Sequence, residues 1–180
     1  MSESAPITLA PLQCLHCQAA IPAQVDEVAW VCETCGQGQL LLENGSLQAI
    51  SVFFSKHIQP GAQGHPFWVA EGSATLQRET YHGNQAREMQ DFWRIPRRFF
   101  VPAYALPLQE VINQGAQFLS QPLPLEEGSR VSFQPVTVPA GDVRPLAEFI
   151  LLGIEADRRD ALKTLKFELT LGEPQLWILP

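Results

Sequence analysis

The chain has 180 residues, of which 46% are hydrophobic and 17% charged, and its formal net charge at pH 7 is −7. The apolar content is sufficient for a sizeable core, whereas the charged fraction lies below the roughly 25% usual for soluble domains and is consistent with a surface that a partner covers in part. The 15 prolines and 12 glycines favour short strands and turns. This composition argues against an all-helical bundle and excludes collagen-like, coiled-coil and wholly disordered chains.

The N-terminal residues lack the features of an export signal. Met1–Ser4 contains no basic residue, and no apolar h-region follows it. No apolar stretch reaches the roughly 18 to 20 residues that span a bilayer, and the longest, around 99–108, is interrupted by Pro102 and Pro107. We therefore expect a cytoplasmic protein without an integral membrane segment. In that reducing compartment, cysteines in close pairs are expected to bind metal rather than to form disulfides.

Two Cys-x-x-Cys pairs lie 14 residues apart: Cys14 and Cys17, then Cys32 and Cys35. Two cysteines three positions apart in a tight turn can direct both thiolates at one ion about 2.3 Å away, and two such turns complete a tetrahedron. Four sulfur ligands leave no open position, which predicts one structural Zn²⁺ per chain. Gly36, after the second pair, suits the positive φ that closes such a turn, whereas Gln18 follows the first pair and gives no such help.

Runs of β-prone residues surround the second cysteine pair. They cover 28–31 and 39–43, and Asn44-Gly45, the preferred dipeptide of a type I′ turn, precedes a third run over Leu47–Phe54. In pair spacing and in this hairpin, residues 12–54 resemble the zinc-ribbon, or rubredoxin-like, domains. The resemblance implies a small three-stranded sheet that holds one zinc. Iron would use the same four-sulfur tetrahedron, which leaves a rubredoxin-like electron carrier as an alternative.

The charge of this N-terminal region argues against a nucleic-acid partner. No Lys or Arg precedes Lys56, whereas five acidic residues do, and binding of a phosphate backbone depends on cationic side chains. Further along, three arginines interleave with aromatic residues over Trp93–Phe100. We expect them to lie at a strand and to bond to nearby carboxylates such as Glu88 and Asp91.

A turn-rich stretch, Gln59–Gly64, predicts a boundary between a zinc ribbon over residues 1–56 and a second domain over residues 57–180. In chain order, the second domain is expected to contain strands at 67–70 and 74–81, a helix capped by Asn84 with Met89 and Trp93 on one face, a strand at 97–104, a helix at 108–119 and a strand at 130–138. Asp142 is expected to cap a helix through Phe149, and the wholly apolar stretch 150–154 is assigned to a strand.

The chain is expected to end in a hairpin. Alternation over Leu165–Leu171 predicts an amphipathic strand. The turn Gly172-Glu173-Pro174 is then expected to lead back into a strand at 176–179. Short helices among these strands predict a mixed, mainly antiparallel α+β domain, with the three-stranded zinc ribbon packed on it.

The expected function is that of a non-catalytic adaptor or assembly subunit that acts through protein–protein contacts. No histidine stands in a metal or nucleophile motif, and zinc uses all four cysteines, so the sequence nominates no catalytic residue. One alternative is an enzyme, such as a hydrolase, with a pocket in the second domain ringed by His65, His82 and carboxylates. The electron carrier is the other alternative. The partner's identity and the oligomeric state stay open.

The hairpin carries more apolar side chain than a module of about 40 residues can bury within itself. Its exposed face is therefore expected to bind a partner, unless the second domain covers it completely. The apolar residues are Leu40, Leu41, Leu42, Leu47, Ala49, Ile50, Val52, Phe53 and Phe54.

Overall fold

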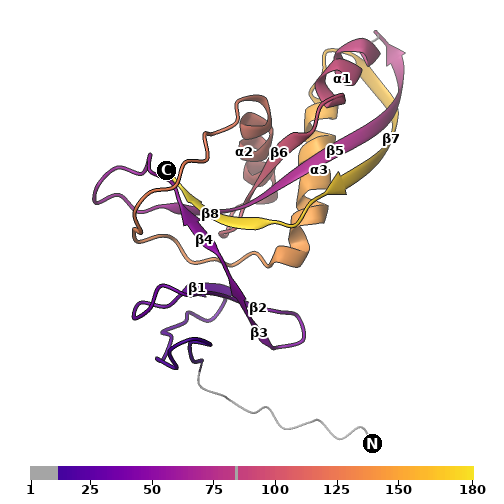
Figure 1. Cartoon of the computed structure of the whole chain (residues 1–180). Helices are drawn as coiled ribbons and strands as arrows, with labels where there is room; N and C mark the ends of the chain where they lie inside the picture. The colour runs from indigo at the N-terminus through magenta and orange to yellow at the C-terminus, as the bar shows by residue number, and fades with distance from the viewer. Residues whose placement is uncertain (1–11, 84) are drawn as a thin grey trace, which may run out of the picture.

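The computed structural model describes residues 12–83 and 85–180 (Figure 1). Asn84, the predicted helix cap, lies outside the described residues. The mixture of strands and helices confirms the α+β class. In chain order the elements are β1 (Ala29–Val31), β2 (Gly38–Leu41), β3 (Leu47–Ile50), β4 (Val52–Phe54), β5 (His65–His82), α1 (Ala86–Trp93), β6 (Arg97–Pro102), α2 (Leu108–Ser120), the short 3-10 helix η1 (Ala140–Asp142), α3 (Val143–Ala156), β7 (Ala161–Leu171) and β8 (Gln175–Leu179).

Strands β1, β2 and β3 form an antiparallel sheet, as predicted for the N-terminal region. The turn between β2 and β3 differs from the expected type I′ turn. The Leu42 amide donates to the Ser46 carbonyl (2.9 Å), which closes a loop of three residues. Within this loop Gly45 alone has a positive φ, at 80°, whereas type I′ needs positive φ at both central residues. The Asn44 side chain instead accepts a hydrogen bond from the Ser46 amide (3.0 Å).

The remaining strands form a mixed sheet in the order β4-β8-β5-β6, with β7 paired to the second half of β5. Strand β4 runs parallel to β8, and the other pairs are antiparallel. The sequence predicted one strand over Leu47–Phe54, but the structure divides it at Ser51. A single residue therefore connects the two sheets (Figure 1). Independent folding of regions 1–56 and 57–180 stays a prediction.

Strand β5 is one strand of 18 residues, where the sequence predicted two. Its first half lies between β8 and β6, and its second half extends beyond them with β7 (Figure 1). Gly72 lies where the two halves meet. A Cβ atom at this position would stand 2.8 Å from the Thr170 carbonyl oxygen and 3.2 Å from the Phe99 ring. A glycine is therefore needed here, because any side chain would collide with the backbone of β7 and crowd the buried Phe99 ring.

Strands β7 and β8 lie end to end along one edge of β5, which corrects the predicted terminal hairpin. Leu171 is opposite Gly72 and Gln175 is opposite Val69. Between these two pairs the β7–β8 edge has three residues where β5 has two. The Gly172 amide still donates to a β5 carbonyl (2.8 Å). The predicted turn is thus a bulge in a continuous edge and not a chain reversal.

Helix α3 continues through residues 150–154, which the sequence assigned to a strand. The helix packs against both α2 and the sheet, and its buried residues recur at helical spacing. Ile150 and Leu151 are fully buried. Gly115 of α2 faces Ile150 so closely that any Cβ there would overlap the isoleucine side chain. Leu152, by contrast, is exposed although it is apolar. Such an exposed apolar residue hides the amphipathic pattern by which a helix is normally recognised.

The predicted strand at Arg130–Val138 is also wrong, because this segment forms isolated bridges instead of a ladder. Val136 bridges Ala29 in β1, and Phe133 bridges Gly64 just before β5. The segment therefore contacts both sheets and holds the first against the second.

Both faces of the central strands are covered. Trp68, Phe99 and Leu176 belong to a core that includes buried residues of α3. On the opposite face, Phe67 and Trp177 belong to a second cluster, to which the end of α2 and the loop after it contribute partly buried side chains. Among the described helices, none has the length and apolar character needed to cross a membrane.

Candidate metal centre

The four cysteine thiols meet beside the first sheet. Their sulfur atoms all lie within 4.8 Å of one another, with 3.6 Å between Cys14 and Cys35 and 3.6 Å between Cys17 and Cys32. A disulfide would need about 2.05 Å, whereas four sulfurs placed about 2.3 Å from a central ion are separated by about 3.8 Å. The predicted ligands therefore form a tetrahedral-like cluster that could hold one metal ion.

The two Cys-x-x-Cys turns share one backbone geometry. The Gln18 amide donates to the Cys14 carbonyl (3.0 Å), and the Gly36 amide donates to the Cys32 carbonyl (2.9 Å). The closing residue has a positive φ in both turns, 61° at Gln18 and 80° at Gly36. This corrects the expectation that Gln18 contributes nothing. It adopts a left-handed conformation that costs a residue with a side chain roughly 1–2 kcal/mol.

The thiols differ in acidity. The amide of Cys35 donates toward Cys32 and, against the effect of burial, lowers the pKa of that thiol to about 6. The amide of Cys17 lowers the pKa of Cys14 in the same way. At Cys35 the amide of Gln37 also acts to lower the pKa, but burial and the three neighbouring thiols outweigh it and raise the pKa to about 12. The cluster thus favours some thiolates at neutral pH, and a bound cation would favour the rest.

Gln39 of β2 supports the first turn. Its side chain is fully buried, and its Oε1 accepts a hydrogen bond from the Leu15 amide (2.7 Å). Its Nε2 has no hydrogen-bond partner among the described residues, and a buried unpaired donor is costly. The sequence placed Gln39 in a β-prone run and gave no sign that it bonds to residue 15.

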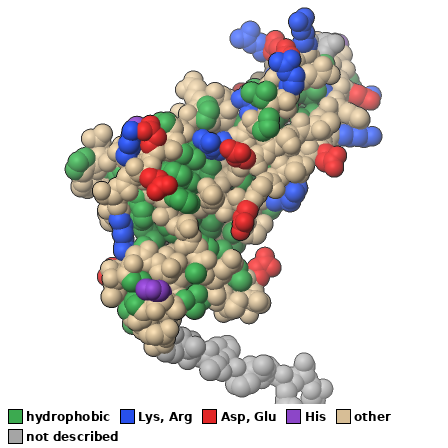
Figure 2. Space-filling view, viewed as in Figure 1, with side chains coloured by type: hydrophobic (Ala, Val, Ile, Leu, Met, Phe, Trp, Pro, Cys, Tyr) green, Lys and Arg blue, Asp and Glu red, His purple; other side chains and the backbone are tan. Residues whose placement is uncertain are grey.

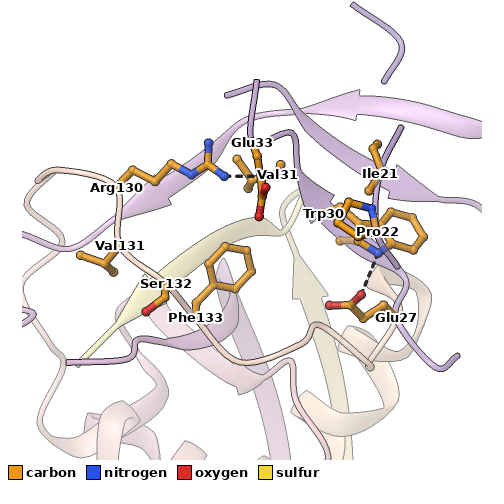
Figure 3. A pocket seen from close by; sticks show the side chains of 11 residues that line it. Ile21, Pro22, Glu27, Trp30, Val31, Glu33, Arg130, Val131, Ser132 and Phe133 are labelled. Atoms are coloured by element: carbon orange, nitrogen blue, oxygen red, sulfur yellow. Dashed lines mark hydrogen bonds between the residues drawn. The ribbon is translucent and has the colours of Figure 1, made fainter. Parts of the chain in front are cut away.

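Arg130 supports the second turn from the far part of the chain. Its Nη1 donates to the Cys32 carbonyl (2.9 Å), and its Nη2 donates to the Val31 carbonyl (3.3 Å). Figure 3 shows the side chain reaching across from its own loop to the backbone at Val31. Because no Lys or Arg precedes Lys56, Arg130 supplies a positive charge that the N-terminal region itself lacks.

A cleft of about 510 Å³ lies between the first sheet and the loop that carries Arg130 (Figure 3). Trp30 and Phe133 are among its walls, and Glu27 and Glu33 contribute carboxylates. Glu27 already accepts hydrogen bonds from the Trp30 indole (3.0 Å) and from a loop amide (2.7 Å). Glu27 and Arg130, two of the residues that line the cleft, therefore bond to the protein itself near the cysteine cluster.

The histidines that the enzyme alternative needs do not share a pocket. His65 is the first residue of β5 and His82 is the last, so the strand holds them at opposite ends (Figure 1). His57 lies on the surface, with its Nε2 atom 3.5 Å from a carboxylate oxygen of Glu126. A pocket ringed by His65 and His82, which would have favoured the enzyme alternative, is therefore not formed.

The arginines of the Trp93–Phe100 region bond to groups other than those expected. Arg97 donates to the Phe92 carbonyl (2.9 Å) and lies 3.6 Å above the centre of the Phe92 ring. Burial lowers the pKa of Arg97. Arg98 pairs with Glu71 across the strands at 3.5 Å. Asp91 was an expected partner of these arginines, but its Oδ2 atom lies 4.0 Å from Nε of Arg87 instead.

A buried ion-pair cluster, absent from the sequence interpretation, joins β5, α1 and the end of α3. Arg78 donates from Nη1 to Glu155 (2.8 Å) and from Nη2 to Asp160, and all three side chains are almost completely buried. Glu155 also accepts bonds from Arg158 (2.8 and 2.9 Å) and from the Trp93 indole (2.8 Å). Two carboxylates face two guanidiniums, so the charges balance and the groups are hydrogen-bonded. These bonds connect the extended β5–β7 arm to α1 and to the end of α3.

Comparison of the chain with protein-family models, with curated proteins and with solved structures gave no match.

Proposed function

We propose that the chain is a cytoplasmic, non-catalytic adaptor or assembly subunit built on a zinc ribbon, and that it acts through protein–protein contacts. The metal is one structural Zn²⁺ held by Cys14, Cys17, Cys32 and Cys35. The observation that carries the proposal is the closed cluster, in which all four thiols face one another within 4.8 Å. An ion with four thiolate ligands has no position open for a substrate, which is the arrangement of structural and not of catalytic zinc.

The surroundings of the cluster support a scaffolding role. Gln39 and Arg130 both bond to backbone atoms of the cysteine turns, which fixes the position of the turns. Leu47 and Ile50 of the same sheet, and Leu42 just after β2, pack against buried clusters and remain only partly buried. Figure 2 shows small hydrophobic patches on the surface of this part of the molecule. A rigid module that presents apolar surface is suited to binding another protein.

Two measurements test this proposal. Elemental analysis of the purified protein should give one zinc per chain in a colourless sample, whereas a red, iron-containing protein would support the electron carrier. Affinity purification from the native host should recover a protein partner with the wild-type chain and lose it with Cys32→Ser. Recovery of no partner by the zinc-loaded wild type would reject the adaptor role.

A further inference from the structure

Strand β3 has an open edge. In the pairing of β2 with β3, the Leu42 amide donates to the Ser46 carbonyl, and Leu40 is opposite Gln48. Because backbone groups alternate in direction along a strand, Leu47 and Ala49 direct theirs away from β2. No described strand pairs with that outer edge, and Ala49 is exposed. An open edge of this kind offers unpaired amides and carbonyls to another chain.

A groove of about 440 Å³ runs beside this edge. Residues 48–51 and Phe53 line it from the β3–β4 segment, and residues 173–175 line it from the approach to β8. Strands β4 and β8 are paired from Val52 and Leu176 onward, so the groove opens where the two chains separate. The bulge at the start of β8 thus leaves space beside β3 that a strand of another molecule can fill.

The base of the groove is apolar. It is formed by residues from both sheets and from η1: Leu40, Leu42, Trp68, Ala140 and Leu176. Successive side chains of a strand point to opposite faces. An added strand would therefore place every second side chain on this apolar base.

The charge at the groove is negative. Glu173 is the one charged residue among those that line it. The Glu43 carboxylate does not line the groove but lies near Gly141, the neighbour of the lining residue Ala140. Neither carboxylate forms an ion pair with another described residue. The groove-lining residues include no Lys or Arg. A basic side chain on the bound segment would be attracted here.

We propose that this groove binds an extended segment of a partner protein, with apolar side chains at alternate positions and a Lys or Arg near Glu173, which adds as a fourth strand to the first sheet at β3. The inference rests on the proposed adaptor function and names its mode of binding. Strand addition gains affinity from backbone hydrogen bonds and specificity from the side chains of every second residue. A second copy of this chain fits less well, because the acidic groups of one copy would meet those of the other.

Backbone pairing is tested by Ala49→Pro with Ala49→Thr as its matched control. Proline removes the outward amide, and an edge strand tolerates it where that amide faces solvent. Threonine keeps the amide.

The probe is a displayed library of random 12-residue peptides, which is selected on the zinc-loaded full chain. The selected peptides are then synthesised and their affinities are measured. We expect alternating apolar residues with Lys or Arg, and binding weakened about tenfold by Ala49→Pro but little changed by Ala49→Thr.

The charge contribution is tested by Glu173→Lys, with Glu168→Lys on the exposed surface of β7 as the control. The first change should weaken the selected peptides about fivefold, with a smaller loss at high salt. The control should leave binding near the wild-type value. Selection of no peptide, or equal binding by wild type and Ala49→Pro, overturns the groove proposal. Equal weakening by both lysine variants overturns the assignment of the basic residue to Glu173.

Two further measurements separate this inference from the function on which it rests. A host partner recovered equally by wild type and Ala49→Pro leaves the adaptor role standing and rejects the groove. Recovery of no host partner rejects the adaptor role. Peptide selection then still tests whether the groove binds an extended segment. If sedimentation shows a dimer, and if Ala49→Pro dissociates it, the occupant of the groove is a second copy of the chain and not a segment of another protein. Circular dichroism and zinc content confirm that each variant is folded.

Discussion

Arg130 donates a hydrogen bond to the carbonyl oxygen of Cys32, which lies 98 residues earlier in the chain. The same carbonyl accepts the Gly36 amide that closes the second cysteine turn. This one oxygen therefore connects the geometry of the cysteine cluster to the packing of the 130–136 segment. A divalent cation bound by four thiolates would carry two negative charges, which the guanidinium would partly balance.

Arg130→Ala should weaken metal binding. The variant loses two hydrogen bonds to carbonyls and a nearby positive charge. Because the arginine is exposed, these losses together should cost about 1 kcal/mol, which is about fivefold in metal affinity. Competition with a chromogenic chelator measures this change. Arg87→Ala, an almost fully exposed arginine on α1, is the control and should not alter the affinity. Equal affinities for wild type and Arg130→Ala would show that this contact does not stabilise the centre.

Gln18→Gly should stabilise the protein by about 1 kcal/mol, because glycine adopts the positive φ of this position without steric cost. Gly36→Ala is the matched reverse change. No atom lies within 4 Å of a Cβ built there, so backbone strain alone should destabilise it by about 1 kcal/mol. Unfolding by guanidinium chloride, with zinc held constant, measures both. The two effects should have opposite signs, and a destabilised Gln18→Gly variant would contradict the shared turn geometry.

Cys32→Ser should abolish metal binding and unfold the first sheet. A sheet this small lacks the core to fold without its metal. The second sheet and its helices have one buried cluster of their own and supply most of a larger one, to which the first sheet contributes Ala29 and Leu40, so they should remain folded. Hydrogen exchange should accordingly rise in β1–β3 and stay slow in β5 and α3. Loss of all cooperative unfolding would instead show that the two parts of the chain are one folding unit.

Asp160 should make stability depend on pH in the acid range. The Arg78 guanidinium, against the effect of burial and with help from the Gln85 amide, holds the pKa of this carboxyl below its ordinary 3.8. The ionised form is thus favoured by folding. Its contribution is fully present above the unfolded-state pKa and is lost as the pH falls through the lower, folded-state value.

The variant Asp160→Asn isolates this contribution. The difference in unfolding free energy between wild type and variant should be constant from about pH 5 to 7 and should shrink below about pH 4. Urea unfolding at a series of pH values measures it. A difference that grows as the pH falls would contradict the assigned direction of the shift.

The sequence by itself determined the features that depend on neighbouring residues. The spacing of the two Cys-x-x-Cys pairs brought four thiols together because a tight turn directs cysteines three positions apart toward one point. The alternation of Leu165–Leu171 correctly indicated strand β7, and the pattern after Pro107 correctly indicated α2. In each case the signal lies within one turn or one strand, so distant contacts were not needed to interpret it.

Only the tertiary structure decided how these pieces combine. Residues 52–54 join the second sheet because β8 pairs with them from more than 120 positions away in the sequence. The stretch 150–154 belongs to a helix that packs against α2 and the sheet, whereas the exposed apolar residue Leu152 hides the helical period in the sequence. Arg78 and Asp160 look like ordinary surface charges in the sequence, yet they are buried together. Local patterns specify which face of an element is apolar, but partners are chosen by contacts between distant residues, and these exist only in the folded chain.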